Sequence, residues 1–335
     1  MKRNSDPTAR RLRVAVVGPG GWGQQHVRIF GGRPDTEVVA VVGRETDRTA
    51  ALAAQARTIG FTDIGRMLEN IRPDLVTIAL PNELHFESTL KVVMAGVPVL
   101  VEKPLVFGLD EADQLLREAE RQNLFFAINF NHRFAEPVRR AKAAIAAGLL
   151  GELVFTSWRF GGEANPHSSH PHAQLIETQC HGFDMLEHLA GPISSVMAQM
   201  TNKTRGSYTT VAIALEFTNG GVGSLLGSYD SSYAYPLTQF IEVNGSAGRL
   251  QIEDTVRRLT ISRSGDESSV VWEAGYFNDS ARDFHQTFDR HVDALVPALL
   301  AGAEPPIHAR AGRRALALAY SCIESFETGC RVFTK

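Results

Sequence analysis

Three polar side chains at helical spacing form a chemically suggestive group in this chain. Glu177, His181 and Asp184 stand four and three residues apart, so a regular helix over residues 175–186 would place all three on one face. A helix face that presents an acid, an imidazole and a second acid together is directed either at a site or at solvent. An imidazole is the side chain best suited to proton exchange near neutral pH, but the spacing alone leaves both a site and a solvent-facing helix surface open.

A lysine at the end of an apolar run is the second candidate. The run over residues 97–101 leads directly into Glu102, Lys103 and Pro104. A strand buried on both faces gives Lys103 little access to water, and desolvation lowers the pKa of an amine toward the range that suits proton transfer. From the residues alone, a lysine that merely pairs with Glu102 at a domain edge is an equally good interpretation.

A glycine-rich turn lies near the start of the chain. Residues 18–23 read Gly-Pro-Gly-Gly-Trp-Gly, directly after an apolar strand pattern and before a helical one. In such a turn Gly18 permits the tight bend, Gly20 lets the backbone approach a pyrophosphate, and Gly23 lets the helix pack on the strand. Trp22 is interpreted first as a cover for the helix start. The position of the turn predicts a dinucleotide site.

The end of the second strand pattern bears on the choice of cofactor. NAD-specific domains usually place Asp or Glu there, whereas this run ends in Gly43 and continues with Arg44. Arg44, with Arg48 one turn further on, can pair with a 2′-phosphate, so NADP is favoured. NAD stays possible because Glu45 or Asp47 could still bind its ribose. We also expect that Gly43→Asp would reverse the preference.

Two kinds of hydrophobic pattern divide the chain. Over residues 12–130, apolar runs alternate with helical patterns, which predicts a Rossmann domain with a parallel sheet. From residue 131, one helix over 135–147 precedes several strand patterns, two of them joined through Asn219-Gly220, a strong hairpin signal. Two helices close the chain. The expected domains are 1–130, which binds NAD(P), and 131–335, which binds substrate through a large, mainly antiparallel open sheet covered by helices.

The composition excludes several classes of function. There are 34 basic and 37 acidic residues, for a net charge of -3, so nothing favours nucleic acid or an anionic membrane, and a small-molecule partner is expected. Three scattered cysteines favour neither a disulfide framework nor a zinc site. With no export signal or membrane span, we expect a cytoplasmic protein. A broad open sheet further predicts a homodimer or homotetramer.

With these motifs in hand, the chain resembles the Gfo/Idh/MocA family of glucose-fructose oxidoreductase, inositol dehydrogenase and rhizopine-catabolism proteins. The resemblance rests on the glycine turn with His26, on the runs over 79–85 and 101–105, on residues 131–134, on the spacing from Glu177 to Asp184, and on residues 245–248. It implies that Lys103 handles the proton of the reacting hydroxyl, with His181 as its partner. It also implies that Glu177, where many relatives carry Asp, binds a substrate hydroxyl.

The site residues follow from the motifs and the resemblance together. The residues expected to bind substrate are Glu177, His132, Arg133 and Asp184. Those expected to bind the cofactor are Gly18, Gly20, Gly21, Trp22, Gly23, Arg44, Arg48, Pro81, Asn82, His85, Glu102 and Lys103. His167, His170 and His172 match no standard zinc spacing, so no metal is expected.

Three functions are weighed for these residues. The first is a dehydrogenase or reductase acting on a sugar, deoxysugar or cyclitol. The second is a redox-neutral glycosidase or lyase that works through a transient keto-sugar. The third is a cofactor-sensing protein without turnover, against which Lys103 and His181 argue because such a protein has no use for a proton path.

Overall fold

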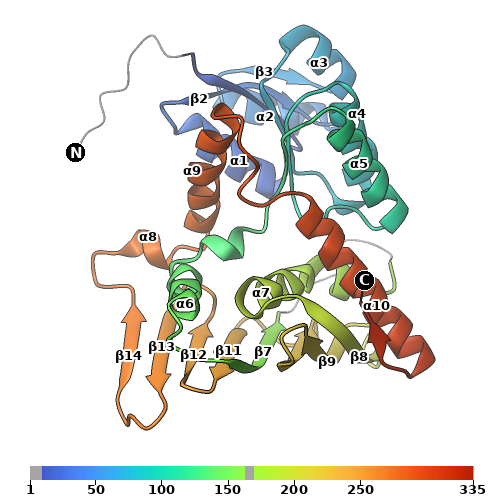
Figure 1. Cartoon of the computed structure of the whole chain (residues 1–335). Helices are drawn as coiled ribbons and strands as arrows, with labels where there is room; N and C mark the ends of the chain where they lie inside the picture. The colour runs from blue at the N-terminus through green and yellow to red at the C-terminus, as the bar shows by residue number, and fades with distance from the viewer. Residues whose placement is uncertain (1–9, 163–169, 335) are drawn as a thin grey trace. The chain divides into compact units, whose positions relative to one another are not determined.

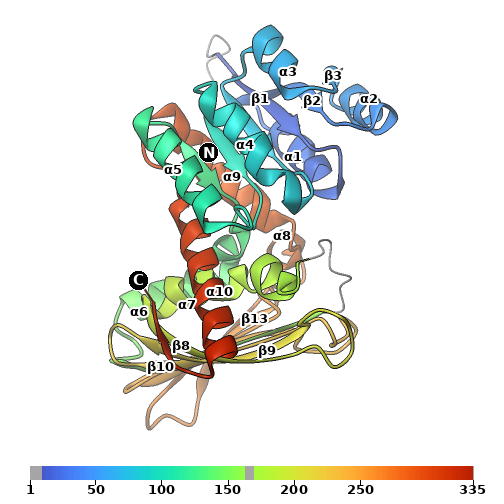
Figure 2. The same ribbon diagram turned by 90° about the vertical axis from the view of Figure 1, so that its right-hand side faces the viewer.

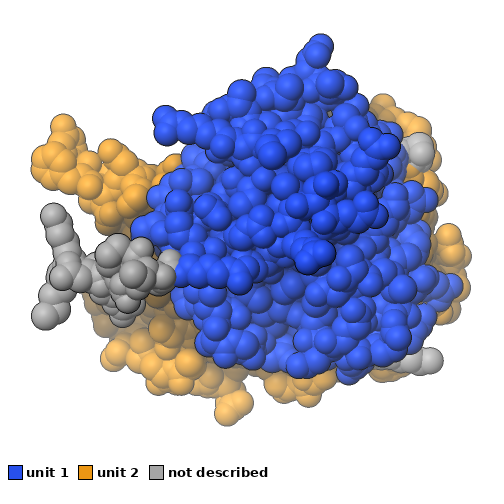
Figure 3. All heavy atoms as spheres, turned by 90° about the horizontal axis from the view of Figure 1, so that it is seen from above, with its two compact units in different colours: residues 1–129, 291–313 blue, residues 130–290, 314–335 orange. Residues whose placement is uncertain are grey.

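Two sheets organise the part of the chain that the structure describes, residues 10–162 and 170–334 of a computed structural model. Unit 1 comprises Met1–Asn129 and His291–Arg313, and unit 2 comprises Phe130–Arg290 and Arg314–Lys335 (Figure 3). The division near residue 130 lies where the sequence pattern changes. Residues 291–313, which the sequence assigned to the second domain, group instead with unit 1.

Unit 1 contains a six-stranded sheet in the order β3-β2-β1-β4-β5-β6, with every neighbouring pair parallel. Its strands are β1 (Leu12–Val17), β2 (Thr36–Val42), β3 (Ile59–Phe61), β4 (Leu75–Ile78), β5 (Val99–Val101) and β6 (Phe126–Ile128). The helices are α1 (Gly21–Gly31), α2 (Thr46–Gln55), α3 (Ile64–Ile71), the 3-10 turn η1 (Asn82–Leu84), α4 (His85–Met94) and α5 (Leu109–Arg121) (Figure 1).

The apolar runs of unit 1 are strands because both faces of this sheet are covered. Residues 14–17 of β1 and all of β4 and β5 are buried, as the continuous Val, Ile and Leu runs predicted. The sequence did not predict β3 or α3. The outer edge of β6 is closed by residues 307–309: Ile128 donates to the carbonyl of Ile307 at 3.1 Å, and Ala309 donates to that of Phe126 at 2.9 Å. These bonds explain why residues 291–313 belong to unit 1.

Unit 2 contains a nine-stranded sheet in the order β14-β13-β12-β11-β7-β10-β9-β8-β15. Its strands are β7 (Leu153–Gly161), β8 (Ile193–Thr201), β9 (Thr210–Phe217), β10 (Val222–Ser228), β11 (Gln239–Gly245), β12 (Gly248–Glu253), β13 (Arg258–Arg263), β14 (Ser269–Glu273) and β15 (Val332–Phe333). The helical segments are η2 (Asn131–Phe134), α6 (Glu136–Ala146), η3 (Gln174–Thr178), α7 (Cys180–Ala190), α8 (Asp279–Arg282), α9 (Gln286–Leu300) and α10 (Arg310–Thr328), and the division between the units falls within α9 and α10.

The sheet of unit 2 is antiparallel except where β10 pairs with β7 in parallel. The predicted hairpin is confirmed, since β9 and β10 pair on either side of Asn219-Gly220. Helices α6, α7 and α10 lie on one side of the sheet (Figure 2). The opposite face of the sheet exposes four apolar side chains, which the strand pairing places on the same side: Phe155, Met197, Val222 and Leu226. Over the described residues, no helix is long and apolar enough to cross a membrane.

Candidate active site

The carboxyl ends of neighbouring strands in unit 1 form one row. Val17 pairs with Val42 and with Ile78, and Ile78 pairs with Val101. The glycine turn, the loop that leads into η1 and the Glu102-Lys103 segment therefore leave the sheet at the same edge. Ligands of open parallel sheets bind outside this edge. The structure thus brings together three motifs that the sequence assigned to the cofactor.

The glycine turn bends tightly at the start of α1 and leaves part of its backbone open. Gly18 has φ +114°, and a Cβ there would lie 2.1 Å from the carbonyl oxygen of Ala79; a Cβ on Gly23 would lie 1.7 Å from that of Gly18. At Gly20 and Gly21, in contrast, a Cβ would meet nothing within 4 Å. Backbone N–H groups at a helix start attract anions, so these residues fit the pyrophosphate of a dinucleotide. The neighbouring Trp22 is exposed.

Gly43, at the end of β2, is a glycine for a steric reason. A Cβ at this position would lie 2.5 Å from Cδ of Pro19 and 2.6 Å from Oγ1 of Thr49. The exchange Gly43→Asp, expected from the sequence to reverse cofactor preference, would therefore push against the glycine turn itself, and it is the wrong test. Arg44 is exposed, and Arg48 forms an ion pair with Glu45 at 3.1 Å.

A buried chain of polar side chains supports the segment that carries Lys103. Glu102 accepts hydrogen bonds from Nε2 of His26 at 2.9 Å and from Nδ2 of Asn129 at 2.7 Å, and Oδ1 of Asn129 accepts from Nδ1 of His291 at 2.8 Å. Burial alone would raise the pKa of Glu102, but the hydrogen bonds from His26 and Asn129 hold it below its usual range. Lys103 itself is partly exposed, not fully desolvated as the sequence suggested.

His85 contacts both the loop after β4 and the loop after β5. Its Nδ1 lies 2.7 Å from the carbonyl oxygen of Pro104, and its Nε2 lies 3.0 Å from that of Leu80. The ring is fully buried, and this burial lowers the pKa of His85. Because both ring nitrogens face backbone carbonyls, His85 is placed to position the loops. Pro81 is exposed and Asn82 is partly exposed, so both residues lie on the outer surface of the loop.

In unit 2 the helix that was expected over residues 175–186 is interrupted. Residues 174–178 form a π turn, in which the N–H of Gln179 donates to the carbonyl of Gln174 at 3.2 Å, and α7 begins only at Cys180. The prediction that Glu177 and His181 share a face of one regular α-helix is therefore wrong. Both side chains are nonetheless buried, Glu177 at 3% and His181 at 7% exposure. A π turn is a frequent feature of functional sites.

Two imidazoles stack in this part of unit 2. The rings of His132 and His181 are parallel, with centroids 4.0 Å apart and an interplanar angle of 2°. The edge of Phe130 faces His181, and Trp158, Phe160 and Phe284 surround His132. Nδ1 of His132 lies 3.3 Å from Nε2 of Gln239 on β11. The structure thus places two predicted site residues, from η2 and α7, in direct contact within an aromatic surround.

Arg133 and Asp184 bind one another. Arg133 donates through Nε at 2.9 Å and through Nη2 at 2.6 Å to the two oxygens of Asp184. Burial raises the pKa of Asp184, and the fork from Arg133 opposes that rise. Because both Asp184 oxygens accept from Arg133, the pair joins η2 to α7 and holds His132 against His181. This geometry favours a positioning role for Asp184 over the direct substrate contact that the sequence suggested.

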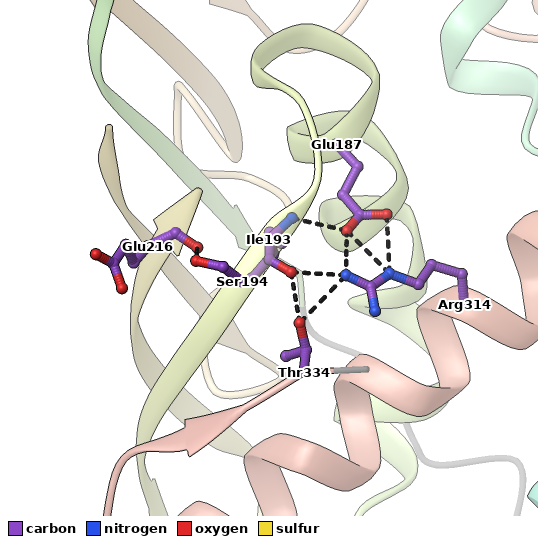
Figure 4. Close-up of polar contacts among 6 residues, drawn as sticks. All are labelled: Glu187, Ile193, Ser194, Glu216, Arg314 and Thr334. Carbon is purple, nitrogen blue, oxygen red and sulfur yellow. Dashed lines mark hydrogen bonds and ion pairs between the residues drawn. The ribbon is translucent and has the colours of Figure 1, made fainter. Parts of the chain in front are cut away.

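The C-terminal end of α7 is anchored by an arginine from α10 (Figure 4). Arg314 donates through Nε and Nη2 to Glu187, at 3.0 and 2.8 Å, and Nη2 also donates to the carbonyl of Ile193 at 2.7 Å and to Oγ1 of Thr334 at 3.3 Å. Glu187 in turn accepts from the N–H of Ile193 at 2.9 Å. The helix that carries His181 is therefore fixed in its middle by Arg133 and near its C-terminal end by Arg314.

Several site residues escaped the sequence analysis. Asn129 follows a buried strand run in the same way as Glu102, and that position could have marked it. His291 and Gln239 gave no local signal, because they contact Asn129 and His132 across 162 and 107 residues of sequence. The predicted His167 lies outside the described residues. Within the described ranges, no group of three His, Cys, Asp or Glu side chains could hold a metal ion.

Two family models match the chain. The oxidoreductase family model with an NAD-binding Rossmann fold matches residues 12–130, and the GFO/IDH/MocA C-terminal domain matches residues 138–251. Together they cover more than half of the sequence. The chain therefore belongs to the Gfo/Idh/MocA family of oxidoreductases, as its motifs indicated, and residues 12–130 are an NAD-binding Rossmann domain.

Individual relatives agree with this assignment. The chain is 24% identical to a myo-inositol 2-dehydrogenase of Thermotoga maritima (94% of this chain, 96% of the relative) and 27% identical to an inositol 2-dehydrogenase of Rubrobacter xylanophilus (96% and 92%). It is 32% identical to an Escherichia coli D-glucoside 3-dehydrogenase over 45% of this chain and 44% of that protein. A levoglucosan dehydrogenase solved with NADH and levoglucosan has the same fold, with a TM-score of 0.87 at 19% identity over 97% of this chain and 100% of the other.

Proposed function

We propose that this oxidoreductase transfers a hydride between a nicotinamide cofactor and a hydroxyl-bearing or keto carbon of a sugar, deoxysugar or cyclitol. The observation that carries the proposal is the buried His132–His181 stack, with the buried carboxyl group of Glu177 four residues before His181 in sequence. Polar groups among aromatic side chains are what a neutral polyol needs, since its hydroxyls take hydrogen bonds and its C–H faces pack on rings. The names of the inositol, glucoside and levoglucosan dehydrogenases among its relatives support the same substrate class.

The roles follow the chemistry of each side chain. The bound nicotinamide supplies the hydride acceptor or donor. Lys103, at the end of β5, takes or returns the hydroxyl proton, with His181 as its partner, and Glu177 accepts a hydrogen bond from a substrate hydroxyl. His132 and Arg133 complete the substrate side. The residues proposed to hold the cofactor are Gly18, Gly20, Gly21, Trp22, Gly23, Arg44, Arg48, Pro81, Asn82 and Lys103, with Glu102 and His85 supporting the loops from inside.

The preferred cofactor is proposed to be NADP. Arg44 is exposed at the end of β2, next to a glycine that has no room for the carboxylate NAD-specific domains usually place there. Arg48 is partly neutralised by Glu45, so Arg44 supplies the main charge for a 2′-phosphate.

A homodimer or homotetramer is also proposed, built on the exposed face of the nine-stranded sheet. Phe155, Met197, Val222 and Leu226 expose apolar surface on neighbouring strands of that face. A charge in the middle of such an interface is costly to desolvate, so Leu226→Arg should lower the molecular mass measured by light scattering to that of a smaller assembly. An unchanged mass would place the interface elsewhere.

Turnover of a substrate panel tests the proposed function. Each sugar, deoxysugar and cyclitol is mixed with protein and either NAD⁺ or NADP⁺, and absorbance of the reduced nicotinamide is followed. The proposal expects net reduced cofactor with at least one member. Consumption of a glycoside without net reduction would instead support the redox-neutral glycosidase or lyase.

A further inference from the structure

We propose that the carboxamide of Gln174 binds a substrate hydroxyl and selects polyols that carry a hydroxyl at that position. The inference rests on the proposed function and extends it to a residue that no sequence motif marks. Gln174 is the first residue of the π turn and its side chain is 1% exposed. Among the residues that the structure describes, neither its Oε1 nor its Nε2 has a hydrogen-bond partner.

A buried primary amide without hydrogen-bond partners is unusual in a folded protein. Burying such a group without partners is unfavourable, and the large majority of buried side-chain polar atoms in native proteins are hydrogen-bonded. A methionine would fill nearly the same volume without this cost. The amide at position 174 therefore points to a partner that the protein alone does not provide.

Gln179, at the other end of the same turn, is a buried glutamine whose amide does form hydrogen bonds within the protein. It is fully buried, its Oε1 accepts from Nε1 of Trp158 at 2.9 Å, and its Nε2 lies 3.4 Å from the carbonyl oxygen of Phe160. Both ends of that amide are used within the protein. Gln174 and Gln179 are thus similarly buried at the two ends of one turn, but only the Gln174 amide lacks hydrogen-bond partners among the described residues. A bound ligand would explain this difference.

The sheet below makes room for the Gln174 amide. A Cβ on Gly227 of β10 would lie 2.6 Å from Nε2 of Gln174 and 2.5 Å from Cδ of Gln179. Glycine at position 227 therefore admits both amides between the π turn and the sheet. Glu177, three residues along the same turn, and His181 are nearly as buried as Gln174, so the π turn and the start of α7 place three buried polar side chains close together in sequence.

The chemistry of an amide defines the ligand. Glu177 as a carboxylate only accepts hydrogen bonds, whereas the Gln174 amide both donates and accepts. A hydroxyl group also does both, so an uncharged polyol matches the pair, with one hydroxyl on Glu177 and another on Gln174. A site built to hydrogen-bond a hydroxyl discriminates strongly against an analogue that lacks it, because the buried polar group is then left unpaired. Gln174 is in this sense a specificity-determining residue.

Matched variants test the inference. In Gln174→Met the orphaned amide is removed, so Tm should stay level or rise, while KM for the best polyol of the panel should increase roughly tenfold or more. Discrimination against that polyol's deoxy analogue should fall by a similar factor, and cofactor Kd should stay the same. Gln179→Met, which loses the Trp158 hydrogen bond, should lower Tm and leave discrimination as in the wild type.

Each outcome bears on one claim. A Gln174→Met protein with wild-type KM and wild-type discrimination would overturn the inference and leave the proposed function standing. No turnover of any polyol by the wild type would contradict the proposed function first, and the inference with it. If Gln174→Met fails to fold, Gln174→Asn keeps the amide but draws it back by one methylene, and it should show the same loss of discrimination in a folded protein.

Discussion

In unit 1 the candidate cofactor site lies at the carboxyl edge of the six-stranded sheet and consists mostly of backbone. It is the glycine turn at the start of α1, where some glycines leave no room for a Cβ and others face open space. In unit 2 the candidate site consists of side chains instead, brought by η2, the π turn, α7 and β11. A backbone cradle accepts any dinucleotide with a pyrophosphate, whereas side chains can change one at a time. From this comparison we expect that cofactor binding and substrate choice can be altered separately in this protein.

The largest change in activity is expected when Lys103 of unit 1 is replaced. Lys103→Met removes the amine proposed to handle the proton, so kcat should fall roughly 10³-fold, within the range typical of a lost general acid or base. Cofactor Kd should change far less than kcat, because Lys103 is one of several residues proposed to hold the cofactor and the glycine turn is untouched. His181→Ala should also lower kcat, but by a smaller factor. Lys91→Met, an exposed lysine on α4, is the control in steady-state kinetics. A near-normal kcat for Lys103→Met would break the assignment.

The next effect concerns Glu177 in unit 2. A hydrogen bond from a hydroxyl to a carboxylate contributes about 1.5 to 3 kcal/mol, so Glu177→Gln should lower kcat/KM roughly tenfold to a hundredfold. Glu177→Asp should be tolerated better, since it keeps the charge. Cofactor affinity should remain that of the wild type, as should the kinetics of the exposed control Glu273→Gln. If both Glu177 variants stay within about twofold of wild-type kcat/KM, Glu177 is a structural acid.

A smaller effect is expected on the cofactor side. Arg44→Ala should weaken NADP binding roughly tenfold while leaving NAD binding unchanged, since only NADP carries the phosphate that Arg44 pairs with. Arg48→Ala should do less because Arg48 already pairs with Glu45. Fluorescence titration of both reduced cofactors measures the preference. Tighter binding of NAD than of NADP by the wild type would contradict the proposed preference.

The smallest effect is on stability and depends on pH. The folded-state pKa of Glu102 lies below its ordinary value of 4.5, so the ionised group stabilises the fold above that pH, and this contribution is lost as pH falls through the folded pKa. Glu102→Gln should therefore lower the urea midpoint most near neutral pH, and the difference from wild type should shrink below pH 4.5. An equal difference at neutral and acidic pH would mean that the charge of Glu102 is not what stabilises the buried chain.

Most of unit 1 could be predicted from its sequence, because a strand buried on both faces is a continuous apolar run and a dinucleotide turn needs glycines at fixed positions. The prediction reached Lys103 and the glycine turn for that reason. It missed β3, which is short and largely exposed, and it misjudged Gly43, whose Cβ would meet Pro19, a contact that no local pattern reveals.

The site in unit 2 was harder to predict. The i, i+4 spacing of Glu177 and His181 indicates an α-helix, and nothing in residues 174–178 signals that a π turn is preferred. The His132–His181 stack and the Arg133–Asp184 fork join segments about 50 residues apart, so their geometry depends on tertiary packing. Residue types suggested the candidates, but only the fold showed that Asp184 binds Arg133.

Transfer of a labelled hydride tests the central claim most directly. Wild-type protein is incubated with oxidised cofactor and the best polyol of the panel, deuterated at its carbinol carbons, and the cofactor released into solution is analysed by mass spectrometry. The account predicts that the released reduced cofactor carries one deuterium, and that Lys103→Met, although it binds the cofactor, produces almost none. Consumption of the polyol with no labelled reduced cofactor in solution would contradict the account.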